Sequence, residues 1–125
     1  MFRNYDKYTI PQLRALAGRK FRAWIRKRDQ EKPCISCGRY TTLEAGHYYS
    51  AGHYPSLEFN EDNVHGQCDR CNRHLHGNSI EYRKGLIERI GGVRVEMLDT
   101  IAGVYKRTGY KHDRIRLIEI IQKYK

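Results

Sequence analysis

The cysteines of this chain form two Cys-x-x-Cys pairs, Cys34 with Cys37 and Cys68 with Cys71. Each pair can bring two thiolates to one ion, and two pairs complete a tetrahedral zinc site. All four cysteines of the sequence fall within this pattern. Cysteines at metal spacing in a reducing compartment indicate zinc ligands rather than disulfides. The sequence therefore predicts a structural zinc ion bound by these four residues.

The segment between the cysteine pairs carries polar residues suited to hydrolysis. His47 ends the run Glu44-Ala45-Gly46-His47, Asn63 follows, and Asn72 comes directly after the last cysteine. A neutral histidine can take the proton of a water molecule, and an asparagine can hold the imidazole in one tautomer. A hard divalent cation with few protein ligands keeps coordination positions open for a phosphate. We therefore expect a second ion, Mg²⁺ or Mn²⁺, beside His47.

Other histidines compete with His47 for this role. His53 repeats the Ala-Gly-His-Tyr setting and is the second candidate for the base, although Pro55 indicates that it lies in a loop. His65, two residues after Asn63, is expected to contact phosphate, support the metal site or cap a backbone group. The sequence leaves these alternatives open.

Two further histidines follow or lie outside the cysteine segment. Asn72 and His76 are spaced i, i+4, so they could share the second metal ion if one helix carried both. His112 is far from the cluster along the chain, and we expect it at the surface.

Glu44 is expected as a metal ligand. It lies three residues before His47, and residues three apart on a regular strand face opposite ways. A bulge at Ala45-Gly46 would correct this.

Charge points to a polyanionic partner. The chain has 24 Lys and Arg against 14 Asp and Glu, a formal net charge of +10. Neutralising phosphates releases counterions, so a basic domain of this size is expected to bind nucleic acid. The residues expected to contact DNA are Arg19, Lys20, Arg22, Arg26, Lys27, Arg39, Arg70 and Arg73.

The predicted helices and strands indicate one α+β domain over residues 1–125. It would consist of a basic helical arm (1–32), a zinc-bound core (33–78) and C-terminal helices (79–125). The expected elements are a helix from Thr9 to Arg28 capped by Thr9, strands over 41–49 and 63–67 around a loop, a helix after Cys71 interrupted at Gly77, and helices over 79–90, 93–105 and from Asp113 onward. The last helix carries an apolar stripe of Ile115, Ile118, Ile121 and Tyr124, expected in the core or at the surface of a homodimer.

No apolar run reaches the length of a membrane span, and the N-terminus lacks the apolar stretch of a signal peptide. We expect a cytoplasmic protein of a bacterial or phage-infected cell, with no membrane partner.

Strand, loop, strand and helix, with histidine on the first strand, asparagine near the second and a polar residue opening the helix, is the layout of a ββα-metal nuclease core. The sequence also resembles the lambdoid-phage NinG (Rap) recombination nucleases, members of the HNH or His-Me finger group alongside phage endonuclease VII. The blocks that carry the resemblance are Cys34-Ile-Ser-Cys-Gly-Arg39, Ala45-Gly-His-Tyr48, Leu57-Glu-Phe-Asn60, Gln67-Cys68, Cys71-Asn72, Leu75-His-Gly-Asn78 and Glu81-Tyr-Arg83.

The resemblance implies magnesium-dependent cleavage of branched recombination intermediates such as Holliday junctions and D-loops. It implies that His47 is the general base, that Asn63 orients it, and that Asn72 is a metal ligand. Glu44 lies near the position of a metal-binding carboxylate, although many HNH enzymes have an aspartate where this chain has Gly46.

Two other functions compete with this one. A zinc-knuckle protein could grip nucleic acid without cutting it, and a zinc ribbon could serve as a protein-interaction module, which the charge disfavours. Tyr48, Tyr49 and Tyr54 could stack on unpaired bases at a branch, or they could be packing residues.

Overall fold

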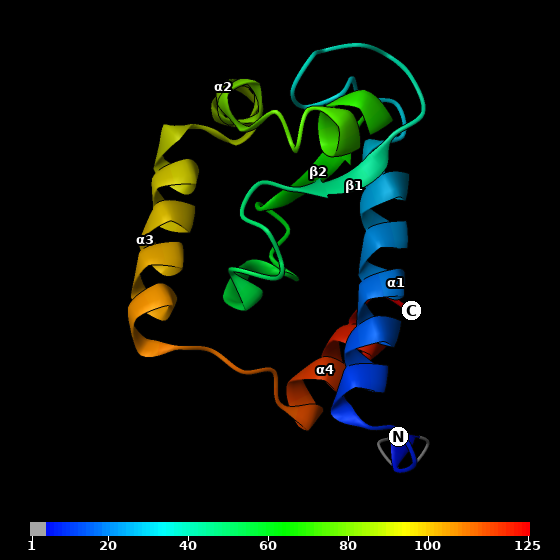
Figure 1. The fold of residues 1–125 in the computed structure, drawn as a ribbon. Helices are drawn as coiled ribbons and strands as arrows, with labels where there is room; N and C mark the ends of the chain where they lie inside the picture. Colours follow the sequence, from blue (N-terminus) through cyan, green and yellow to red (C-terminus); the bar gives the residue numbers. More distant parts are fainter. Residues whose placement is uncertain (1–4) are drawn as a thin grey trace.

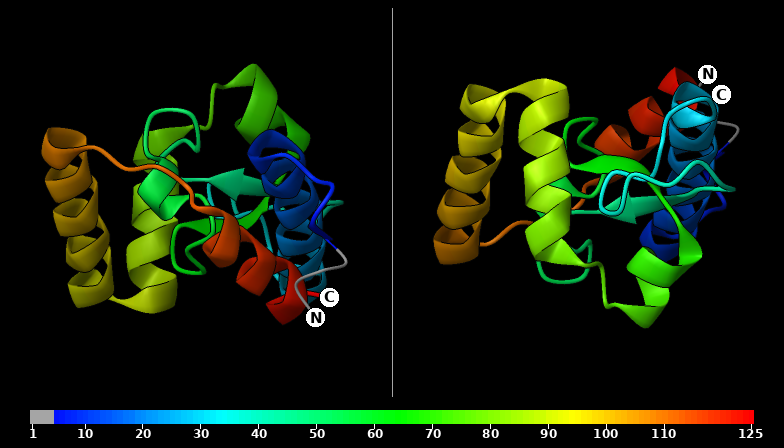
Figure 2. Two further views of the ribbon diagram at one scale, coloured as in Figure 1. Left: turned by 90° about the horizontal axis from the view of Figure 1, so that it is seen from below. Right: turned by 90° about the horizontal axis from the view of Figure 1, so that it is seen from above.

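Figure 1 shows the computed structural model, which describes residues 5–125 as a mixed α+β fold that is mostly helical. Its elements are α1 (Ile10–Asp29), β1 (Glu44–His47), the 3-10 turn η2 (Pro55–Leu57), β2 (Val64–Gln67), the short π-helix η3 (Arg70–His74), α2 (Ser79–Ile90), α3 (Gly92–Thr108) and α4 (Arg114–Lys123). The two strands lie between the α1–α4 pair on one side and the α2–α3 pair on the other (Figure 2).

Helix α1 begins with a capping box. Thr9 Oγ1 accepts a hydrogen bond from the Gln12 backbone N–H at 3.2 Å, and Gln12 Oε1 accepts one from the Thr9 backbone N–H at 2.8 Å. Both bonds satisfy donors that a helix N-terminus would otherwise leave free, and Pro11 in the first turn has no N–H that would need an acceptor. The predicted helix and its cap are confirmed.

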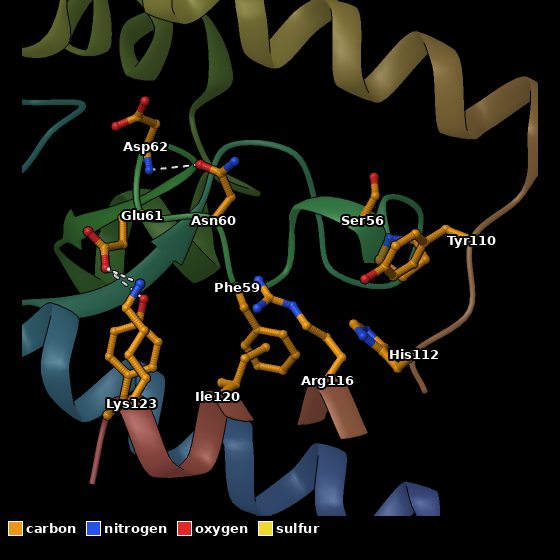
Figure 3. Close-up of a pocket in the computed structure, with 12 residues that line it drawn as sticks. Ser56, Phe59, Asn60, Glu61, Asp62, Tyr110, His112, Arg116, Ile120 and Lys123 are labelled. Atoms are coloured by element: carbon orange, nitrogen blue, oxygen red, sulfur yellow. Dashed lines mark hydrogen bonds and ion pairs between the residues drawn. The ribbon is translucent and has the colours of Figure 1, made fainter. Parts of the chain in front are cut away.

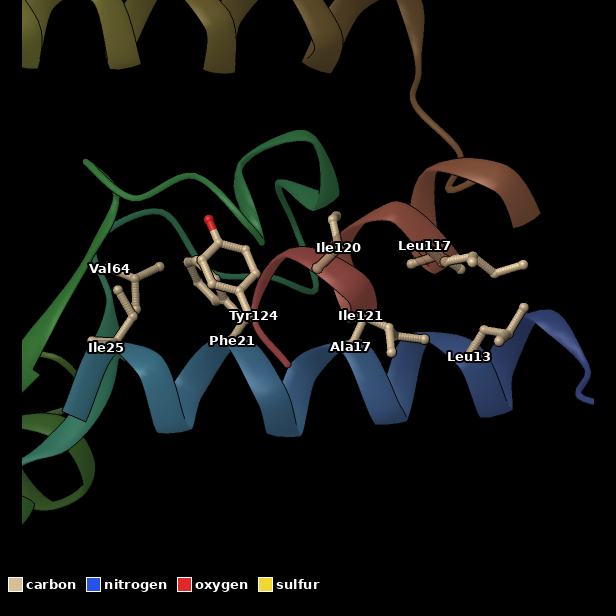
Figure 4. Close-up of a cluster of buried hydrophobic side chains, with 10 residues drawn as sticks. Leu13, Ala17, Phe21, Ile25, Val64, Leu117, Ile120, Ile121 and Tyr124 are labelled. Carbon is tan, nitrogen blue, oxygen red and sulfur yellow. The ribbon is translucent and has the colours of Figure 1, made fainter. Parts of the chain in front are cut away.

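The main core forms where α4 lies along α1 (Figure 4). Its buried side chains are Leu13, Ala17, Phe21, Ile25, Val64, Leu117, Ile118, Ile120, Ile121 and Tyr124. Asp113 caps α4 as predicted, because its carboxylate accepts a hydrogen bond from the Arg116 backbone N–H at 2.8 Å.

The apolar stripe predicted for α4 is confirmed for three of its four residues. Ile118, Ile121 and Tyr124 are buried, whereas Ile115 is 61% exposed, and Leu117 and Ile120 add to the buried face. The apolar face of α4 packs on α1 and Val64 within the same chain. It is therefore core, and it is not available as the dimer surface that the sequence also allowed.

A second core joins α2 and α3 to the loop between the strands. Leu57, Tyr82, Leu86, Val95 and Leu98 are buried in it. Helix α2 also lies against the first cysteine pair, because a Cβ on Gly85 would come within 1.9 Å of the backbone oxygen of Ile35. Only glycine permits this approach, which fixes α2 beside the cysteines.

The two strands pair antiparallel in a continuous register from Glu44 opposite Gln67 to His47 opposite Val64. The bulge expected at Ala45-Gly46 is therefore absent from this pairing. The first strand is shorter than predicted, because Leu43 packs among the cysteines instead of extending the ladder. The loop predicted over residues 50–62 is confirmed, with η2 inside it.

A buried carboxylate fixes the end of α1 to the hairpin. Asp29 is fully buried, accepts a hydrogen bond from the Gly66 backbone N–H at 2.8 Å and pairs with Arg28 at 2.7 Å. Burial alone would raise the pKa of Asp29, but the bonds from Arg28 and Gly66 hold it well below its usual value. The helix and the strands are thus joined by an ionised group.

Within residues 5–125, no helix combines the length and apolar character that a membrane crossing requires.

Candidate functional site

The four cysteines converge as the spacing predicted. Their sulfur atoms all lie within 4.8 Å of one another, and Cys37 Sγ and Cys68 Sγ are 3.8 Å apart. Zinc–sulfur bonds of about 2.3 Å in tetrahedral geometry place sulfur atoms about 3.8 Å apart. No disulfide joins the cysteines. The donor set and its spacing therefore fit structural zinc, held by Cys34, Cys37, Cys68 and Cys71.

Backbone donors favour the thiolate form at Cys34. Burial raises the pKa of this thiol, but hydrogen bonds from the backbone of Cys37, Cys68 and Ser36 outweigh it and lower the pKa to about 7. The bond from the Cys68 N–H spans 3.3 Å. Gly38 makes the turn possible with a φ of +77°.

Asn78 supports the same cluster in a way that the sequence did not indicate. Its side-chain amide donates to Cys71 Sγ at 3.6 Å, and its backbone is left-handed with a φ of +43°. The sequence predicted only that the helix after Cys71 is interrupted at Gly77. A Gly-Asn pair shortly after the second cysteine pair was the available signal for a polar contact to the thiolate.

Glu44 and Asn72 meet beside the zinc cluster. Asn72 Nδ2 donates to Glu44 Oε1 at 2.8 Å, joining η3 to β1. Arg73 also binds this carboxylate, with Nη2 at 2.9 Å from Oε2. The hydrogen bond from Asn72 is the main reason that the pKa of Glu44 lies below its ordinary value, with Arg73 and Arg26 adding to it. The structure thus brings together two of the expected metal ligands. Because β1 has no bulge, His47 lies on the opposite face of the strand from Glu44.

His47 lies at the other end of β1 and is held by a backbone carbonyl. Its Nε2 is 3.0 Å from the oxygen of Glu58. Because a carbonyl only accepts, Nε2 carries the hydrogen and Nδ1 of the neutral ring keeps a lone pair. Burial lowers the pKa of His47, and the nearby Arg22 charge lowers it further, against the opposing effect of Glu58.

The Asn63 side chain makes no hydrogen bond with His47 in the described part of the chain, which corrects the expectation that it orients the imidazole directly. Its fully buried side chain accepts from the Tyr49 N–H at 2.9 Å and donates to the carbonyls of Tyr49 and Leu57 at 2.9 and 3.0 Å. These bonds close the loop between the strands. Because the loop presents the Glu58 carbonyl, Asn63 acts on His47 only through this backbone.

The remaining histidines take structural or exposed positions. His53 is exposed in the loop, with Nδ1 3.1 Å from Ser50 Oγ. His65 is buried against Arg28 and the Asp62 carbonyl. Of the three roles left open for His65, the backbone contact is the one observed.

His76 and His112 differ from expectation. Helix η3 ends at His74, and His76 is exposed with a φ of +52°, so His76 does not share a continuous helix with Asn72. The reason given for a shared metal ion therefore does not hold. His112 was expected at the surface, yet its side chain is 6% exposed and its Nε2 lies 2.9 Å from Glu58 Oε1.

The basic residues of α1 divide between two sides of the helix. Arg19, Arg22 and Arg26 are spaced i, i+3, i+7 and share one side, whereas Lys20 and Lys27 lie on another. The charges of Arg22 and Arg26 lower the pKa values of His47 and Glu44, respectively. The arginine side of α1 therefore runs beside the candidate site.

Three more predicted DNA contacts surround the cysteines. Arg39 and Arg70 are exposed, and Arg73 is paired with Glu44 and Asp69.

The tyrosines of the loop pack against one another. Tyr49 makes edge contacts with Tyr48 and Tyr54 at centroid distances of 4.9 and 4.8 Å. The Tyr49 hydroxyl donates to Asp99, which also pairs with Arg83. These contacts agree with the alternative that the three tyrosines are packing residues.

Comparison with known proteins agrees with the sequence blocks. The family described as Bacteriophage Lambda NinG protein matches residues 7–125. Protein ninG of Salmonella phage P22 is 42% identical over 99 residues, which cover 78% of this chain and 47% of the relative. Protein ninG of Escherichia phage lambda is 48% identical over 80 residues, or 62% of this chain and 39% of the relative.

The chain spans about half the length, or less, of these curated relatives. No solved structure matches it. The match over nearly the whole chain shows that this protein belongs to the NinG family of phage proteins.

Proposed function

We propose that this chain is an HNH-type endonuclease that hydrolyses phosphodiester bonds in branched DNA, using His47 as general base and one divalent metal ion. The observation that carries the proposal is the contact of Asn72 with Glu44, on the strand that ends at His47. A protein that binds nucleic acid without cleaving it does not need Glu44, Asn72 or His47.

The hairpin followed by η3 supports a ββα-metal core. Zinc would fix both ends of this unit, because one cysteine pair precedes β1 and the other spans the start of η3. The rigid unit would then present the strand residue Glu44 and the helix residue Asn72 to the same space.

His47 is arranged to accept a proton. Its Nε2–H is bound to the Glu58 carbonyl, so Nδ1 accepts the proton of the attacking water. The lowered pKa keeps the imidazole neutral at pH 7, the form that a base requires. Asn63 holds the loop that supplies this carbonyl.

The oxygens of Glu44 and Asn72 suit a hard divalent cation. Magnesium and manganese prefer carboxylate and amide oxygens, and Asn72 keeps Oδ1 available because it contacts Glu44 through Nδ2. A bound ion would supply positive charge to the phosphate oxygens. Arg73 balances the Glu44 carboxylate and can turn to the substrate backbone.

Charge supports DNA as the substrate. The net charge of +10 and the arginine side of α1, formed by Arg19, Arg22 and Arg26, favour a phosphate backbone alongside the site. Preference for branched DNA follows from the family resemblance and forms part of the proposal.

The test is cleavage of end-labelled Holliday junctions with Mg²⁺, compared with EDTA. His47→Ala should lower the cleavage rate by about two to four powers of ten, the usual scale for a general base, while leaving binding intact. His53→Ala is the matched control, because His53 is exposed in the loop that follows β1. If the wild-type protein binds junctions but leaves every strand intact with Mg²⁺ and Mn²⁺, it is a zinc-knuckle binding protein instead.

A further inference from the structure

Three separate parts of the chain meet at one buried carboxylate, that of Glu58. This residue directly follows η2 in the loop between the strands. Its Oε1 accepts a hydrogen bond from Arg14 Nε of α1 at 2.7 Å and another from His112 Nε2 at 2.9 Å. Figure 3 shows that His112 comes from the segment that joins α3 to α4. One oxygen atom therefore links the loop to α1 and to the segment before α4.

The two donors hold Glu58 in its ionised form. Burial raises the pKa of Glu58, but the bonds from His112 and Arg14 outweigh it and keep this pKa below its ordinary value. Because a carboxylate only accepts, His112 contributes an N–H at Nε2. The His112 ring is itself buried and lies beside the rings of Phe59 and Tyr110, with a centroid distance of 5.3 Å to each (Figure 3). The carboxylate is thus bound from two fixed directions.

The backbone of the same residue holds His47. The Glu58 carbonyl lies 3.0 Å from His47 Nε2, and this contact sets the tautomer of the neutral ring. The preceding carbonyl, that of Leu57, is held separately by Asn63 Nδ2 at 3.0 Å. The carboxylate and the carbonyl of Glu58 share one Cα, so a fixed carboxylate restricts how far the carbonyl can turn. Asn63 and the carboxylate therefore restrain consecutive residues of the loop beside His47.

We propose that Glu58 is a positioning residue for His47. Arg14 and His112 hold its carboxylate, and this keeps the Glu58 carbonyl aimed at Nε2 of the imidazole, so that Nδ1 remains free to accept a proton. The inference rests on the proposed function, because it takes His47 as the base, but the state of the ring can be measured without cleavage. It assigns Arg14 to the loop rather than to DNA, and it connects the segment before α4 to the site.

The test separates the hydrogen bonds of Glu58 from its charge. Glu58→Gln removes the charge, but the amide oxygen can still accept from both donors, because both bind one carboxylate oxygen. Glu58→Ala removes the charge and the acceptor together. Two-bond ¹H–¹⁵N NMR spectra of the full chain loaded with zinc report which nitrogen of His47 carries the hydrogen. The Nε2–H form should dominate in the wild-type protein and in Glu58→Gln, whereas Glu58→Ala should show both tautomers.

Cleavage of junctions with Mg²⁺ gives a second measurement. Glu58→Ala should lower the single-turnover rate by about tenfold, the lower end of the effect of losing a group that orients another, without changing junction affinity. Glu58→Gln should stay near the wild-type rate. His112→Phe removes the donor but keeps an aromatic ring beside Phe59 and Tyr110, and it should change the tautomers in the same direction as Glu58→Ala. His53→Phe, at an exposed histidine, is the control and should change nothing.

Thermal melting shows which variants fold, and His112→Phe decides the question if Glu58→Ala does not. Folded variants that keep the wild-type tautomer of His47 overturn the positioning role. If Glu58→Gln shows the same mixture of tautomers as Glu58→Ala, the charge acts on the ring and the hydrogen bonds do not, which also overturns it. If the spectra differ as expected but the wild-type protein cuts no strand with Mg²⁺ or Mn²⁺, it is the proposed function that fails.

Discussion

Asn72 Nδ2 donates a hydrogen bond to Glu44 Oε1 over 2.8 Å, which connects the residue after the second cysteine pair to the first strand. The two residues are far apart in the sequence and are on different elements. Zinc-bound cysteines next to both of them would hold this contact in place, so the structural ion and the candidate catalytic ion depend on one scaffold.

Removing the Glu44 carboxylate should weaken binding of the second metal ion. We expect Glu44→Gln to lower Mn²⁺ affinity by at least about tenfold, the lower end of the effect of losing even a ligand-orienting contact. Titration calorimetry of zinc-loaded protein measures it. Glu81→Gln is the control, since Glu81 is exposed and pairs only with Lys84. If the two variants bind Mn²⁺ with equal affinity, Glu44 is not a ligand of the second metal ion.

The cleavage rate should depend on pH through His47. The base must be neutral, and its pKa lies below 6.5, so the single-turnover rate should stay level at neutral pH. It should then fall about tenfold per pH unit once the pH drops below that pKa. Arg22→Gln should move this acidic limb to higher pH, because the Arg22 charge disfavours the imidazolium. An acidic limb centred above pH 6.5 in the wild-type protein contradicts His47 as the base.

Loss of a zinc ligand should unfold the region around the hairpin. Cys68 is buried, and structural zinc contributes folding free energy on the order of 10 kcal/mol. We expect Cys68→Ser to retain less zinc by elemental mass spectrometry and to lose the cooperative melting transition seen by circular dichroism. Thr42→Ala, at an exposed position before β1, should melt like the wild-type protein. A Cys68→Ser protein that melts normally without zinc would disprove the structural role of the ion.

His65 should make the fold sensitive to mild acid. Burial, followed by the Arg28 charge, lowers the pKa of His65 from 6.5 to about 4. Between these values the unfolded chain binds a proton that the folded chain does not, so the free energy of unfolding falls as the pH falls through this window. The loss is about 3 kcal/mol when complete.

Urea denaturation at pH 7 and pH 4.5 measures this effect. His65→Gln should be less stable at pH 7, because it disturbs the contacts to Arg28 and Asp62, but its stability should change less between the two pH values. If the variant shows the full wild-type decline, another group is responsible.

Local signals in the sequence predicted most of the elements. The cap at Thr9, the start of the last helix at Asp113 and the interruption at Gly77 all follow from backbone chemistry that one or two residues determine. The zinc ligands were equally predictable, because the Cys-x-x-Cys spacing is itself a short-range constraint.

Contacts across the fold were not predictable in this way. Nothing near His112 in the sequence shows that Glu58 will bury it, and the role of the Glu58 carbonyl at His47 depends on how Asn63 closes the loop. The exposure of Ile115 was not predictable either, because α1 and Val64 together decide which residues of α4 are covered. Such choices belong to tertiary packing, which periodicity alone does not specify.

The packing of α4 on α1 has a consequence for synthesis on the ribosome. Helix α1 leaves the exit tunnel before α4, and until α4 emerges the hairpin and its loop cover only part of the apolar face of α1. During that interval the nascent chain leaves Leu13, which packs on α4 in the finished fold, exposed to solvent, while the cysteine pairs can already bind an ion. Assembly of the metal-bound part can thus precede closure of the main core.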